Sequence, residues 1–129
     1  MSHYSFIKIL QDNQLMRSSS EVIAFEQALE ELAQNPNSDD LPSLYLILND
    51  DCQQPDVMFS LVHFVESFDI QAQIQAFIQV VPILIEQAPE WTEILYTRIN
   101  NDKTARTVFD TTLQSMNIEK REKLSTYYS

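Results

Sequence analysis

The sequence predicts an all-α fold, and three observations carry this prediction. Apolar side chains recur every three or four residues through most of the chain, which is the spacing of one buried helix face. Proline, asparagine and aspartate separate these segments from one another. No segment sustains the apolar-polar alternation of a strand. The 129 residues include no glycine, where average usage of about 7% would give about nine. Tight hairpins, phosphate-binding loops and dinucleotide-binding turns, which need glycine, are therefore disfavoured.

We expect about six to seven antiparallel helices in one domain spanning residues 1–129, because the connections between helical segments are short. The helices would form either an irregular bundle or a short α-solenoid of HEAT-like pairs, although no sequence motif repeats at a fixed period. The helical segments are residues 4–16, 21–35, 41–48, 56–68, 70–88, 90–99, 103–116 and 118–128.

The first boundaries depend on capping residues. Serines at 18–20 offer an N-cap for the helix that follows them. Asn35 and Pro36 should end that helix, because asparagine tolerates the left-handed conformation and proline cannot continue the hydrogen-bond ladder. Asp39 or Asp40 is then expected to cap the next helix.

Prolines mark the later boundaries. Pro55 and Pro89 are expected in the first turns of their helices, where a missing N–H costs nothing. Pro82 falls inside a long helical segment, so it should kink the helix or break it near Val81. Residues 100–102 are expected to separate the next two helices.

Acidic residues are concentrated in one part of the chain. Residues 18–97 contain fourteen Asp and Glu and no Lys or Arg, within a chain of net charge −11. A segment of one sign repels itself, which favours a basic protein partner, although acidic helical proteins are also simply soluble. Nucleic acid is disfavoured as a partner, because the only basic cluster is Lys120, Arg121 and Lys123.

The composition also limits compartment and chemistry. No apolar run is long enough to span a membrane, and the N-terminus lacks the features of a secretory signal, so we expect a cytoplasmic protein without membrane contact. Cys52 is the only cysteine, which excludes an internal disulfide and a cysteine metal cluster. With no basic residue near it in the sequence, Cys52 is expected to be an unreactive structural thiol. No cofactor is expected.

Phe59 is the exception on an otherwise polar helix face. Helical projection of residues 56–68 places it between Glu66 and His63, where it would either anchor an interface or pack under a neighbouring helix. His63 and Glu66 are three residues apart and could form a hydrogen bond or half of a metal site. A metal site is disfavoured, because His3 is the only other histidine.

Arg98 is predicted on the apolar face of its helix, where an unpaired charge would be costly. We therefore expect a carboxylate partner, with Glu66 as the first candidate and Asp69 or Asp102 as alternatives. The stem of Arg98 is expected to pack on Trp91 while its guanidinium ties two helices together. This structural role is preferred to catalysis or ligand binding.

Two segments of the sequence resemble the central signature of the immunity protein 30 family. They are DVMFSLVHFVESFD at residues 56–69 and PEWTEILYTRINND at residues 89–102, and the resemblance extends over roughly residues 20–116. It implies a small helical protein, encoded beside a polymorphic toxin of bacterial competition, that binds and neutralises this toxin without catalysis of its own. The residues that carry the resemblance are Phe59, His63, Glu66, Trp91, Arg98 and Asn100.

An immunity protein would turn its acidic face toward a basic toxin surface, and a nuclease is one guess for the toxin. For Asp39, Asp40 and Asp56, helix capping is preferred to partner recognition. The candidates for partner binding are Asp39, Asp40, Asp50, Asp51, Asp56, Phe59 and His63.

Two other functional classes stay open. A helical adaptor unrelated to toxins would use the Phe59 face or a concave surface. An acid/base hydrolase would need two converging carboxylates, and nothing in the sequence marks such a pair, so no catalytic residue is expected.

Overall fold

A computed structural model describes residues 3–115, and this part of the chain is helical without a strand. The prediction of an all-α fold is confirmed. The helix expected over residues 118–128, with its basic cluster, lies outside the described residues. The elements are α1 (His3–Asp12), α2 (Ser19–Gln34), the 3-10 helix η1 (Ser38–Asp40), α3 (Leu41–Tyr45), α4 (Pro55–Glu66), α5 (Ile70–Gln87), α6 (Pro89–Asn101) and α7 (Lys103–Gln114).

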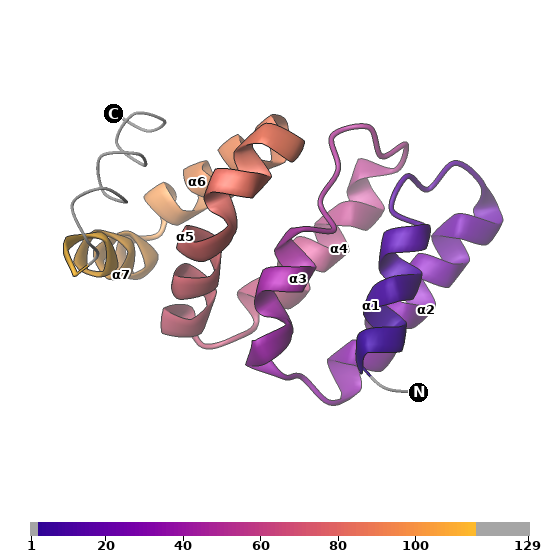
Figure 1. Cartoon of the computed structure of the whole chain (residues 1–129), viewed down its shortest axis with the longest axis horizontal. Helices are drawn as coiled ribbons and strands as arrows, with labels where there is room; N and C mark the ends of the chain where they lie inside the picture. The colour runs from indigo at the N-terminus through magenta and orange to yellow at the C-terminus, as the bar shows by residue number, and fades with distance from the viewer. Residues whose placement is uncertain (1–2, 116–129) are drawn as a thin grey trace.

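The helices form a row of pairs (Figure 1). The α1–α2 pair is at one end, α3–α4 and α5–α6 follow, and α7 lies at the other end. Helices α1, α3 and α5 form the layer nearer the viewer, and α2, α4 and α6 form the layer behind. This arrangement is closer to the short solenoid than to the irregular bundle, and it places α4 and α6 in the same layer.

One continuous apolar core runs along the row. Leu10, Phe25, Leu44, Met58 and Phe77 come from five different helices, and each is fully buried. Further along, the Phe109 ring of α7 packs against the rings of α5 and α6. Burial of these side chains, and not local propensity, stabilises helices as short as α3.

The start of α2 follows the prediction, but its end does not. Ser18 is the N-cap, and its hydroxyl accepts a hydrogen bond of 3.2 Å from the backbone N–H of Glu21. Asn35 follows the helix with φ −143° and ψ 72°, so the expected left-handed conformation is wrong. The described residue with positive φ is Met16, at 49°. Its side chain is 1% exposed, and this burial offsets the cost of a Cβ in the left-handed region.

Asp40 occupies the N-cap position of α3, as expected, but neither Asp39 nor Asp40 caps a helix through its side chain. Asn37 caps the 3-10 helix instead, with its side-chain oxygen 3.0 Å from the backbone N of Asp39. Asp40 makes no capping bond, because its carboxylate lies 2.5 Å from Nδ1 of His3. This contact ties the start of α1 to the start of α3.

The capping role expected for Asp56 is also wrong. The N-cap position of α4 belongs to Gln54, which makes no side-chain capping bond, and Asp56 lies inside the first turn. A carboxylate there still stabilises the helix, because it faces the positive end of the helix dipole.

The prolines behave as helix-start and helix-bend residues. Pro55 and Pro89 each open a helix, and Pro82 lies inside an α5 that stays one helix through Gln87. Figure 1 shows α5 changing direction toward its C-terminal end, so the kink is observed and the break is not. Only Asp102 lies between α6 and α7, where residues 100–102 were expected, because α6 continues through Asn101.

Candidate functional site

A carboxylate from a distant loop holds the start of α6. Asp50 lies in the loop between α3 and α4, and it accepts backbone hydrogen bonds of 2.9 Å from Glu90 and 3.1 Å from Trp91. The Trp91 indole Nε1 donates to the backbone oxygen of Asn49 at 3.1 Å. Three hydrogen bonds therefore connect this loop to the first turn of α6.

The local sequence explains why α6 needs a cap from elsewhere. Ala88 occupies the N-cap position and has no side chain that can accept a hydrogen bond, and Pro89 follows it. The free N–H groups of the first turn require an acceptor, and the charge of Asp50 also suits the positive helix end. Sequence reasoning missed this contact; its only local signal is a helix start without a capping side chain.

An aromatic contact joins α4 to α6 beside this cap. The Phe59 and Trp91 rings meet edge to face, with centroids 5.0 Å apart and an interplanar angle of 66°. Trp91 is 4% exposed, and Phe59 is partly buried against the core. Phe59 thus packs under a neighbouring helix, which was one of the two roles considered from the sequence.

A bidentate ion pair forms the second link between α4 and α6. Arg98 Nε donates to Glu66 Oε2 at 2.8 Å, and Arg98 Nη2 donates to Glu66 Oε1 at 2.7 Å. Glu66 was the first of the three carboxylates considered. The other two cap helices, since Asp69 accepts from the start of α5 and Asp102 from the start of α7. The hydrogen bonds with Glu66 raise the pKa of the Arg98 guanidinium above its ordinary value.

The expected surroundings of Arg98 are wrong in two respects. Its side chain is 39% exposed and that of Glu66 is 34% exposed, so neither charge is buried. The guanidinium carbon of Arg98 lies 5.9 Å from the centroid of the Phe59 ring, where the sequence predicted packing on Trp91. Trp91 is instead turned toward the loop that it binds through its indole nitrogen.

His63 is exposed and does not use Glu66 as a partner. Both Glu66 oxygens are engaged by Arg98, and in the described part of the chain His63 makes only a ring contact, with its centroid 6.2 Å from that of Phe59. The hydrogen bond considered between His63 and Glu66 is therefore not formed.

The residues that carry the family resemblance are close together in the fold. Asn100, at the end of α6, accepts a hydrogen bond from Nη1 of Arg106 and so links α6 to α7. The other five form one network of ring contacts and hydrogen bonds across α4 and α6: Phe59, His63, Glu66, Trp91 and Arg98.

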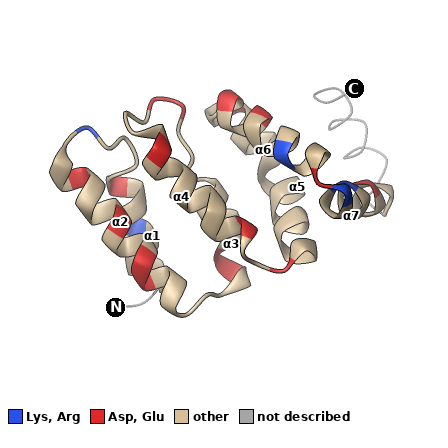
Figure 2. Cartoon of the chain, turned by 180° about the vertical axis from the view of Figure 1, so that it is seen from behind, with Lys and Arg blue, Asp and Glu red and all other residues tan. Residues whose placement is uncertain are grey.

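Exposed acids occur on the same loop and helices as this network. We define the α4–α6 surface as the exposed residues Asp51, Asp56, His63, Glu90 and Glu93. None of its four carboxylates makes an ion pair within residues 3–115. Figure 2 shows acidic segments in the loop before α4 and at the starts of α4 and α6, visible from one side. The four carboxylates of this surface are therefore unpaired in the described residues, whereas the partly exposed Arg98 of the same helix pair is held by Glu66.

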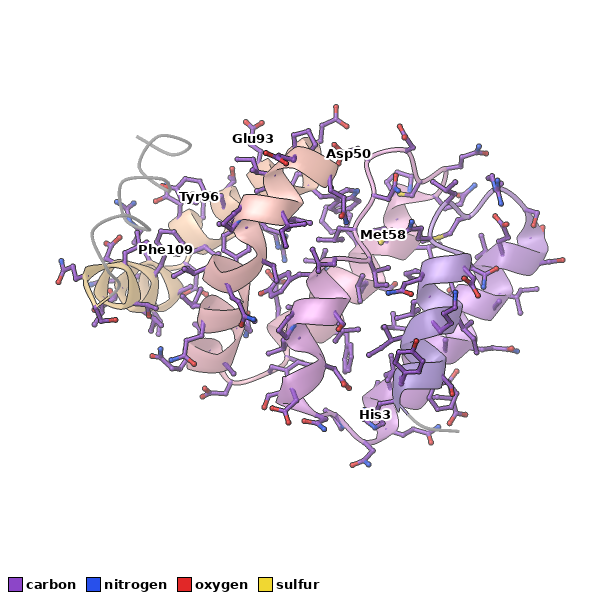
Figure 3. The ribbon with its side chains drawn as sticks, in the orientation of Figure 1. His3, Asp50, Met58, Glu93, Tyr96 and Phe109 are labelled. Carbon is purple, nitrogen blue, oxygen red and sulfur yellow. The ribbon has the colours of Figure 1, made fainter. Side chains whose placement is uncertain are left out.

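The candidates for partner binding do not form one group. Asp50, Asp51, Asp56, Phe59 and His63 belong to the loop before α4 and to α4 itself. Asp40 contacts His3 at the start of α1, and Asp39 lines a depression together with residues of α5. Figure 3 labels His3 and Asp50 at opposite edges of the molecule.

A depression of about 390 Å³ lies beside the ion pair, between α4, α5, α6 and α7. Its carboxylates are Glu66 and Asp102, and both are already engaged, one by Arg98 and the other by the backbone N–H of Ala105. The converging free carboxylates of a hydrolase are not found in this depression. Its other lining residues are Ile70, Gln73, Arg98, Ile99, Asn101 and Ala105.

Cys52 is the remaining reactive group considered from the sequence. Burial raises the pKa of the Cys52 thiol, which lowers its thiolate fraction, as expected for a structural cysteine. Across residues 3–115, no three His, Cys, Asp or Glu side chains gather in a group suited to a metal ion. None of the helices described there is long and apolar enough to cross a membrane.

Comparison with protein families adds one finding. The family model described as Immunity protein 30 matches residues 12–121, a longer region than the two segments that suggested the resemblance. Searches of curated proteins and of solved structures returned no match to this chain.

Proposed function

Because this chain belongs to the immunity protein 30 family, we propose that it binds a cognate toxin protein and neutralises it inside the producing bacterial cell. The match over residues 12–121 carries this proposal, because it includes α2 to α7 entirely. Neutralisation would occur by occupation of the toxin surface, without catalysis by this chain. If the toxin attacks nucleic acid, the cytoplasm is the compartment in which this protection would act.

The α4–α6 surface is the region that we propose for toxin binding. Asp50 fixes the loop before α4 to α6, and the aromatic pair and the ion pair fix α4 to α6. The exposed carboxylates of this surface are therefore carried by elements that are held together. A preformed surface loses little conformational entropy on binding. Acidic charge of one sign accelerates association with a basic partner, and the nucleic-acid-binding surface of a nuclease would be one such partner.

The direct test is coexpression with the toxin domain encoded beside the gene of this chain. We expect growth to be restored and a complex to be recovered from the same cells. A complex without rescue would favour the helical adaptor over the immunity protein, and neither rescue nor complex would contradict both.

Charge-reversal variants test the surface within the same experiment. The double substitution Asp51→Lys and Asp56→Lys should weaken or abolish rescue, because it places two positive charges opposite a basic toxin. Glu26→Lys with Glu86→Lys is the matched control, because it makes the same charge change at exposed positions outside the α4–α6 surface. Equal loss of rescue by both pairs would show that only net charge matters and would remove the α4–α6 surface from the proposal.

A further inference from the structure

A second surface lies between α1 and α2, away from the α4–α6 surface. The groove there has a volume of about 650 Å³. Phe6 and Ile9 of α1 and Ala24 and Ala28 of α2 form its apolar floor. Its polar lining residues are Gln27, Glu30 and Glu31.

The position of this groove makes its apolar floor unusual. The α1–α2 pair ends the row, and Figure 1 shows no described helix beyond it. Terminal units of helical arrays normally carry a polar outer face, because no neighbour covers them. Here two large apolar side chains of the same pair are also exposed, Tyr4 at 77% and Ile23 at 54%.

The charge at the groove is acidic and unneutralised. Glu30 and Glu31 of the groove, and Glu26 beyond it on α2, make no ion pair in the described part of the chain, and Lys8 of α1 is engaged by Asp12 at 3.0 Å. Figure 2 shows the acidic positions spread along α2. A ligand of this groove must therefore combine apolar side chains with positive charge.

We infer that the α1–α2 groove binds an amphipathic helix of a basic partner protein. Its apolar face would cover the floor formed by Phe6, Ile9 and Ala24, and its Lys or Arg side chains would face Glu30 and Glu31. The small alanines at positions 24 and 28 let a helix approach closely, and α2, of sixteen residues, provides a docking length of about 24 Å. This inference goes beyond the proposed function, because it requires neither the α4–α6 surface nor a toxin.

A helix fits this groove better than an extended segment does. The walls are two helices whose backbone groups are hydrogen-bonded internally, so they offer no row of free N–H and C=O groups to a strand. A helix brings its own backbone hydrogen bonds and needs only side-chain contacts. A second copy of this chain is disfavoured, because the same end of two molecules would bring Glu30 and Glu31 against their equivalents.

The test uses a labelled synthetic peptide of about 18 residues, with leucines on one helical face and lysines on the other. We expect saturable binding in fluorescence anisotropy, with amide chemical-shift changes confined to α1 and α2. Ala24→Arg should weaken binding at least about tenfold, because it fills the groove and adds a like charge. Ala33→Arg is the matched control, since it makes the same substitution at an exposed position of the same helix and should leave the affinity within about twofold.

A second pair of variants separates the groove from general electrostatics. Glu30→Lys should weaken peptide binding more than Glu26→Lys, which changes an exposed α2 residue that does not line the groove. Absence of binding, shifts spread over the whole chain, or equal losses within each pair would overturn the inference. If the chain instead forms a concentration-dependent dimer, and Ala24→Arg dissociates this dimer, then the ligand of the groove is a second copy of the chain and not a basic helix. These outcomes do not depend on the toxin experiment, so the two proposals can fail separately.

Discussion

At the scale of single residues, Asp50 and Trp91 connect more of the structure than their neighbours do. Asp50 supplies the N-cap that α6 lacks, and Trp91 binds the same loop through its indole while its ring meets Phe59 of α4. The loop, α4 and α6 are therefore held together by hydrogen bonds and ring packing around one indole. Loss of any of these contacts should affect the others.

Replacing the cap should destabilise the protein measurably. We expect Asp50→Ala to lower the free energy of unfolding by about 1–2 kcal/mol, because two N–H groups of α6 lose their acceptor. Urea denaturation measures this change. Asp51→Ala is the control, because its carboxylate makes no such contact within the described residues, and an equal effect of the two substitutions would contradict the capping role.

Removing the ion pair should have a smaller effect. Because both side chains are more than one third exposed, we expect Arg98→Ala to cost about 1 kcal/mol, where a buried pair would cost about 3 kcal/mol or more. A double-mutant cycle with Glu66→Gln isolates the pair. A coupling free energy of zero would mean that the bidentate geometry contributes nothing to stability.

At the scale of elements, the existence of the helices and the starts of α2, α4 and α6 could be predicted, but most of the other helix ends could not. Apolar spacing identified each helix from α1 to α7, because one face of each is buried. The ends depend on contacts made after folding. Asp40 looks like a cap in the sequence but contacts His3, thirty-seven residues away. Asn35 looks like a left-handed terminator, but it follows α2 with φ −143°, and the positive φ among the described residues is found at the buried Met16.

The candidate site also contains contacts that could be predicted from the sequence and contacts that could not. Helical projection placed Arg98 on the apolar face of its helix, which called for a carboxylate partner, and Glu66, the first candidate, is the residue that it meets. Their exposure could not be predicted, because it depends on how closely α4 and α6 approach. The contact of Asp50 with Trp91 spans forty-one residues, and no local pattern encodes it.

The contact between α3 and α5 leads to a pH prediction. The hydroxyl of Tyr45 donates to the backbone oxygen of Gln73 at 3.2 Å, and burial raises the pKa of this phenol, with a smaller contribution from the charge of Glu66. In the unfolded chain the phenol ionises near its ordinary pKa of about 10. The fold favours the neutral phenol. The neutral phenol therefore contributes its full share of the free energy of unfolding below about pH 10, and this share is lost as the pH rises further.

We therefore expect the stability of the Tyr45→Phe variant to fall less steeply with pH above about pH 10 than that of the original chain. At neutral pH the same variant should be less stable by about 1 kcal/mol, because one hydrogen bond is lost. Thermal unfolding at a series of pH values measures both effects. Tyr4→Phe, at a position that is 77% exposed, should keep the steep alkaline loss; an unchanged slope for Tyr45→Phe would contradict the prediction.

At the scale of the whole molecule, five acids of the acidic segment make contacts within the fold, either as ion-pair partners or as helix caps. Of its fourteen acids, Glu21, Asp40 and Glu66 pair with Arg17, His3 and Arg98. Asp50 and Asp69 cap helices. The acids that remain lie on the α4–α6 surface and along α2, with Asp39 and Glu86 elsewhere.

This distribution predicts that association with a basic toxin depends on salt. Raising the ionic strength from about 0.05 M to 0.5 M should lower the association rate constant at least about tenfold while changing the dissociation rate much less. Stopped-flow kinetics separates the two rate constants. A salt-independent association rate would mean that the acidic surfaces do not steer the toxin.

The central claim is that this chain neutralises a toxin by binding it, and a calorimetric titration tests it most directly. The purified chain would be titrated into the toxin domain encoded beside its gene, with toxin activity measured in the same samples. We predict a stoichiometric complex with a Kd of about 10⁻⁸ M or lower, and loss of toxin activity in proportion to complex formed. Absence of binding, or binding that leaves the toxin fully active, would contradict the claim.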